Sequence, residues 1–124
     1  MNIWILAAAG LSAVTTLIHF FAGGREIARP LLDADDLQKI AKLTNYFCWH
    51  LITLVLAAIT TGFVYIAYHP NELALLIGLS VLCLLFAVLN AGIILRYRVS
   101  PLLMPQWLLL GGMGVLGFTG YWGL

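Results

Sequence analysis

Four long apolar segments, separated by short polar connections, dominate this chain of 124 residues. The segments cover residues 3–22, 43–68, 73–95 and 102–122. Each has about 20 residues or more, the length that an α-helix needs to cross a hydrocarbon core roughly 30 Å thick. The pattern predicts a single all-α integral membrane domain. Because the connections are short, the four transmembrane helices are expected to form an antiparallel up-down bundle.

The composition indicates that lipid is the solvent for these helices. Hydrophobic residues make up 63% of the chain and charged residues only 9%, against roughly 25% charged residues in soluble domains. A net charge of +1 without a Lys/Arg-rich stretch argues against nucleic acid as a partner. Cys48 and Cys83 lie inside apolar runs without metal-site spacing, so we expect them to pack as small apolar residues.

The basic residues predict the orientation in the membrane. All six Lys and Arg side chains lie in two connections, residues 23–42 and 96–101. Because short cytoplasmic loops of membrane proteins are enriched in Lys and Arg, both connections are predicted to be cytoplasmic. Both termini would then lie outside, and the chain would be a multi-pass protein of the inner membrane.

The first basic connection has its own predicted organisation. The glycine pair at 23–24 is expected to end the first helix, and residues 33–42 to form a short amphipathic helix, acidic at its start and basic at its end. This helix is expected either to run into the second span or to lie along the membrane surface. Arg25 and Arg29 are candidates for gripping a phosphate or carboxylate, and Glu26 is placed to pair with Arg29. Arginines at this level also meet anionic lipid headgroups without specificity.

Four polar residues inside the apolar segments share one depth. His19, His50, Asn90 and Gln106 each lie six to eight residues from the basic residue that flanks their segment. At about 1.5 Å per residue, all four should lie roughly 9–12 Å inside the cytoplasmic boundary. Polar side chains in a membrane usually face the interior of a bundle, so the shared depth predicts a shared site.

The two histidines are the centre of this predicted site. His19 belongs to a stripe of small and polar residues on the first segment, and His50 to a similar stripe on the second. The two stripes are expected to face one another. A facing histidine pair would suit axial ligation of haem iron or, together with Glu26, part of a metal site.

An organic ligand is the alternative content of the same site. A quinone- or lipid-like molecule would be hydrogen-bonded by His19, His50, Asn90 and Gln106, with Trp49 and Trp107 as stacking walls. Such polar residues also serve as hydrogen-bonding contacts between membrane helices, worth on the order of 0.6 kcal/mol each. The glycine-rich fourth segment is expected to pack closely against neighbours on two sides.

Three functions fit these patterns. The first is a small inner-membrane protein whose cytoplasm-side site, centred on the histidine pair, binds a metal, haem or a quinone- or lipid-like ligand. The second is a non-catalytic accessory or assembly subunit of a larger membrane complex or homo-oligomer. A small transporter comes third, because no ionisable relay crosses the bilayer centre. The patterns leave open whether the protein is an enzyme.

Overall fold

The computed structural model describes residues 2–123, and every regular element in that part of the chain is helical. The elements are α1 (Ile3–Leu17), the π-helix η1 (Ile18–Ala28), α2 (Arg29–Asp33), α3 (Lys39–Tyr68), α4 (Leu73–Tyr97) and α5 (Gln106–Trp122). The first three follow one another without a break and form one helical rod.

Three of these helices are long and apolar enough to cross a membrane: the rod from Ile3 to Asp33, α3 and α4. The chain is therefore built as a multi-pass helical membrane protein. The helix α5 is shorter, with 17 residues, because it begins at Gln106 instead of residue 102. Pro105 disfavours helical geometry in the residue before it, and residues 100–103 form a separate turn closed by the Leu103 N–H and the Ser100 carbonyl.

The predicted end of the first helix was wrong, and the predicted amphipathic helix forms only in its last part. The glycine pair does not end the first helix, which continues to Asp33, and residues 39–42 are helical as the start of α3. Residues 34–38 make a bend, and α3 begins at Lys39. Glycine stops a helix only where the backbone can leave helical geometry. Here Gly23 is held against Trp49 of α3, so the missing side chain permits close packing of two continuing helices.

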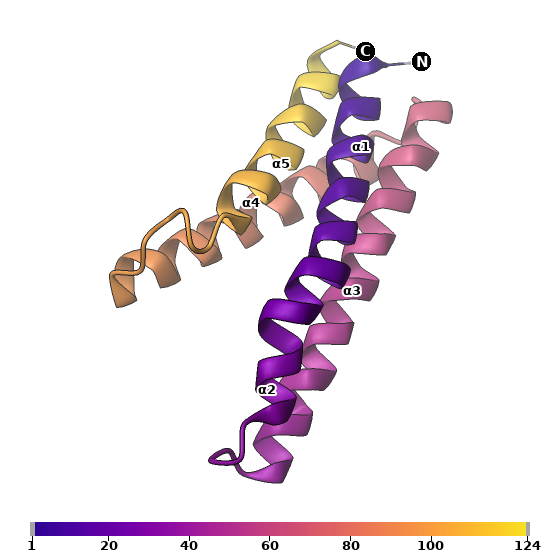
Figure 1. Ribbon diagram of the computed structural model, residues 1–124. Coiled ribbons are helices and arrows are strands. Elements are labelled where there is room, and N and C mark those ends of the chain that lie inside the picture. The colour runs from indigo at the N-terminus through magenta and orange to yellow at the C-terminus, as the bar shows by residue number, and fades with distance from the viewer. Residues whose placement is uncertain (1, 124) are drawn as a thin grey trace.

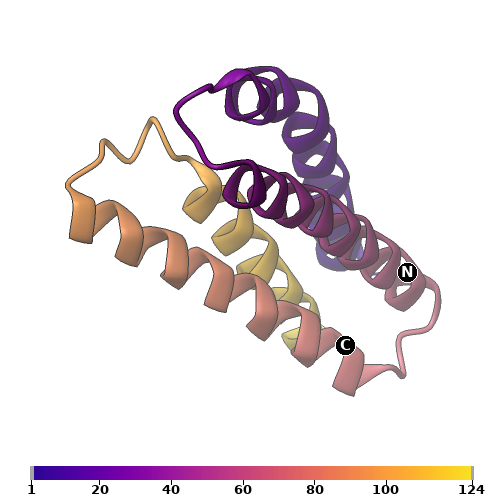
Figure 2. The same cartoon turned by 90° about the horizontal axis from the view of Figure 1, so that it is seen from below.

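The helices form two pairs that converge at one end of the molecule (Figure 1). The helix α1 packs along α3, and α4 packs along α5; α1 also contacts α5, whereas the contact between α3 and α4 is much smaller. The views in Figures 1 and 2 show α3 and α4 diverging from the turn that joins them. Both chain ends lie at the converging end, and the basic connections lie away from it.

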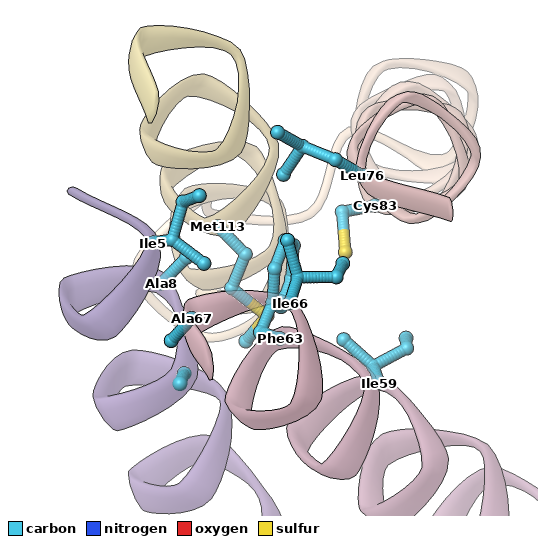
Figure 3. Close-up of a cluster of buried hydrophobic side chains, with 10 residues drawn as sticks. Ile5, Ala8, Ile59, Phe63, Ile66, Ala67, Leu76, Cys83 and Met113 are labelled. Carbon is cyan, nitrogen blue, oxygen red and sulfur yellow. The ribbon is translucent and has the colours of Figure 1, made fainter. Parts of the chain in front are cut away.

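The converging end contains the hydrophobic core (Figure 3). The buried residues that form it come from four helices and are Ile5, Ala8, Ala9, Ile59, Phe63, Ile66, Ala67, Leu76, Cys83 and Met113. Phe63 and Cys83 are fully buried. Cys83 therefore packs as expected, whereas Cys48 is exposed on α3. Near this core the Ser12 and Thr60 hydroxyls share a hydrogen bond of 2.8 Å between α1 and α3.

The glycines of α5 face two neighbours, as the sequence predicted. A Cβ atom on Gly114 would lie 2.6 Å from Leu84 Cγ on α4, and one on Gly120 would lie 2.6 Å from Ile5 Cγ1 on α1. Gly117 also faces α4. Absence of a side chain at these positions lets α5 approach both neighbours closely. The bundle is thus closed at this end and open at the other.

Candidate functional site

A cleft of about 410 Å³ lies between the helix pairs in their diverging half. Its lining comes from the first helical rod, α3, α4, α5 and the segment before α5. Most lining side chains are apolar; the ones with polar groups are Thr15, His19, Glu26, Trp49, Asn90 and Gln106. A mainly apolar hollow of this size with a few polar groups is typical of small-molecule sites.

His19 is fixed on one wall of the cleft by Trp49. The imidazole stacks on the indole, with ring centroids 3.9 Å apart and an angle of 17° between the planes. Its Nε2 atom lies 3.2 Å from the Trp49 carbonyl oxygen. Because a carbonyl can only accept a hydrogen bond, Nε2 carries the proton and donates it. Nδ1 of the neutral ring then remains an acceptor.

The π-helical geometry of η1 and a glycine together place this pair. In η1 the backbone bonds reach five residues back, as in the bond from the Arg29 N–H to the Gly24 carbonyl. The Trp49 indole lies where a side chain at residue 23 would be, since a Cβ on Gly23 would be 2.5 Å from Trp49 Cη2. Segments of π-helix are rare and are frequently found at functional sites.

Asn90 and Gln106 approach the cleft from the opposite pair of helices. The Asn90 side-chain oxygen accepts a hydrogen bond of 3.1 Å from the Trp107 backbone N–H. It thereby caps α5, because Pro105 at the N-cap position has no side-chain acceptor. This bond directs the Asn90 amide, whose NH₂ group donates to no other described residue. Gln106 is exposed and is the first residue of α5.

Trp107 does not belong to the cleft lining, so it does not form the expected stacking wall. Its indole Nε1 donates a hydrogen bond of 3.3 Å to the Pro101 carbonyl. Trp107 therefore ties the segment before α5 to the start of that helix, and Trp49 is the cleft's tryptophan.

His50 opens onto a second hollow of about 280 Å³. Its ring meets Tyr46 edge to face, with centroids 4.5 Å apart. Trp49 lines both hollows. Neighbouring residues on an α-helix point about 100° apart. Because the Trp49 side chain is directed at His19, the His50 side chain is directed toward the second hollow. The two histidines share a level but do not open onto one cleft.

The charged residues near the site are also divided between the hollows. Glu26 lines the cleft, whereas Arg29 lines the second hollow, where its Nε lies 3.9 Å from Asp33 Oδ2. The predicted pair of Glu26 with Arg29 is thus replaced by a pair with Asp33. Arg25 is exposed and lines neither hollow.

The candidate metal ligands do not gather at one point. Among residues 2–123, no group of three or more His, Cys, Asp or Glu side chains lies close enough to hold a metal ion. Glu26 and His19 line the cleft, and His50 lines the second hollow. The polar groups that share the cleft can form hydrogen bonds within its apolar walls.

Sequence reasoning missed Gly23 as a site residue. The glycine pair has the composition of a helix end, and only the tryptophan at the same depth on the next segment hints at a close contact. Comparisons with family models, with curated proteins and with solved structures found no match.

Proposed function

We propose that this chain is a four-helix inner-membrane protein that binds an amphipathic, quinone- or lipid-like molecule from the cytoplasmic side. The observation that carries the proposal is the cleft of about 410 Å³. Its walls are mainly apolar, and three different helices contribute the polar side chains of His19, Asn90 and Gln106. The apolar part of a ligand would lie along the walls, and its polar groups would meet these three side chains.

The proposed topology has α5 as the fourth span and both termini outside. All six basic residues lie in the two connections at the open end, as the positive-inside rule requires of cytoplasmic loops. The 17 residues of α5 are at the lower limit for crossing a bilayer. A short span is accommodated by local thinning of the bilayer at modest cost.

Each polar side chain has a defined role in the proposal. Nδ1 of His19 accepts a hydrogen bond from a ligand hydroxyl or amine. The Asn90 NH₂ group donates to a ligand oxygen, since the other end of that amide caps α5. Gln106 has both a donor and an acceptor and meets the ligand from the same side.

Two probes that carry hydroxyl groups distinguish the possible sources of such a ligand: a benzoquinol with a decyl tail, and a single-chain zwitterionic phospholipid. Each is titrated into the purified protein in phosphatidylcholine nanodiscs, with empty nanodiscs subtracted. We expect saturable binding of one probe and a two- to tenfold weaker Kd, by order of magnitude, in His19→Ala, the equivalent of one hydrogen bond.

His50→Ala is the matched control, because it removes the same ring from the second hollow. Its Kd should equal that of the wild type. Absence of saturable binding of either probe would refute the proposed function. An equal loss in both histidine variants would instead restore the facing-pair hypothesis.

A further inference from the structure

Glu26 is the only charged residue in the lining of the cleft. This is unexpected from the sequence, because all six Lys and Arg residues lie in the connections at the same end. None of the six lines the cleft. The connections at this end thus carry the six basic residues together with Asp33, Asp35 and Asp36, whereas the lining of the cleft carries a single carboxylate.

The contacts of several basic side chains explain this separation. Arg29 approaches Asp33 in the second hollow, and Lys42 Nζ donates a hydrogen bond of 3.0 Å to the Leu32 carbonyl at the end of α2. These contacts hold both cations on the α2–α3 side of the molecule. Glu26 has no salt-bridge partner among the described residues, so its charge is left to act on whatever enters the cleft.

Glu26 also lies nearer to the open end of the rod than His19 does. It follows His19 by seven residues, which would span roughly 10 Å in an α-helix and span less in the wider turns of η1. An amphiphile that enters from the cytoplasmic side would therefore meet the carboxylate with its headgroup while its tail passes His19.

We infer that the cleft selects amphiphiles by the charge of the headgroup, preferring an ammonium or hydroxyl head over a phosphate or carboxylate head. The inference rests on the proposed function, because it requires that the cleft binds an amphiphile at all. The Glu26 carboxylate and His19 Nδ1 both accept hydrogen bonds and therefore call for a ligand that donates them. The carboxylate additionally attracts a cation and repels an anion.

The size of the selection follows from Coulomb's law. A unit charge about 5 Å from the carboxylate in a water-like dielectric gains or loses the equivalent of roughly fourfold in affinity. A cationic head and an anionic head on the same tail should therefore differ by about tenfold or more. A neutral head should fall between them.

The test uses three probes with one tail: dodecylamine, dodecanol and dodecanoate. Their Kd values are measured at neutral pH with the protein in phosphatidylcholine nanodiscs, and empty nanodiscs are subtracted. Glu26→Gln should abolish the preference for the amine over the carboxylate while the Kd of dodecanol stays within about twofold. Asp36→Asn is the matched control, because it removes a carboxylate from the exposed connection outside the cleft and should leave the order unchanged.

The outcomes separate this inference from the proposed function. In one outcome the wild type binds the three probes equally well, and Ala22→Trp, which fills the cleft, abolishes that binding. This result would show that the cleft binds amphiphiles without charge selection, and only the inference would fail. Tighter binding of dodecanoate than of dodecylamine, or an unchanged order in Glu26→Gln, would also overturn it. If neither these probes nor the quinol and phospholipid bind, the proposed function itself fails.

Discussion

Replacing Gly117 by alanine tests whether direct contact between helices holds the closed end of the bundle. A Cβ atom at this position would overlap Ser80 Oγ and lie 3.2 Å from both Ser80 Cβ and Phe63 Cε1. Ser80 and Phe63 are fully buried. The Ser80 hydroxyl also donates a hydrogen bond of 2.7 Å to the Leu76 carbonyl, which opposes rotation out of the way.

The expected cost combines two opposing terms. Inserting a methyl group into a packed core typically costs about 1–3 kcal/mol, whereas alanine gains up to about 1 kcal/mol over glycine in helix propensity. The free energy of unfolding should therefore fall by roughly 1–2 kcal/mol in Gly117→Ala. Gly78→Ala on α4 is the matched control, because a Cβ there meets no atom within 4 Å. Its stability should be unchanged or slightly higher.

Unfolding by SDS in mixed micelles, followed by far-ultraviolet circular dichroism, measures these differences. The double variant Gly117→Ala with Ser80→Gly should recover part of the loss, since it removes the overlapping side chain; the coupling between the two changes is read from a double-mutant cycle. Equal stability of Gly117→Ala and Gly78→Ala would refute the contact argument.

Two further substitutions probe other contacts. Gly23→Ala should displace the Trp49 indole, because the new Cβ would lie 2.5 Å from Cη2 and 3.0 Å from Cζ2. We expect an altered near-ultraviolet circular dichroism spectrum and several-fold weaker binding of the cleft ligand; an unchanged spectrum would contradict this. Ser12→Ala removes the 2.8 Å hydrogen bond to Thr60 and should lower the free energy of unfolding by about 0.6 kcal/mol. Full stability of this variant would show that the bond contributes nothing.

The hydrophobic pattern predicted the main helices well because apolar length is a property of each segment alone. The ends of α3 and α4 lie within a few residues of the predicted ones. The start of α5 and the path of residues 23–38 could not be predicted in the same way. Both depend on contacts with another helix: the Asn90 cap on α5, and the packing of Gly23 on Trp49.

The candidate site was predictable in depth but not in direction. Distance from the basic connections placed His19, Asn90 and Gln106 at one level, and the structure brings these three to one cleft. The direction of a side chain around its helix depends on the helix type and on the neighbour that it packs against. That is why Trp49 occupies the place expected for His50.

The π-helical segment gives residues 18–28 an unusual tolerance of a change in length. Each turn closed by a bond to the fifth residue holds about one residue more than an α-turn. Deleting one residue here would convert one such turn to an α-turn, so the part of the rod beyond the deletion would keep its approximate direction relative to α3. The same deletion in α1, which stores no extra residue, would turn everything beyond it by about 100°. A deletion in α1 would therefore displace both His19 and Glu26 from the cleft, whereas one between them would be absorbed locally.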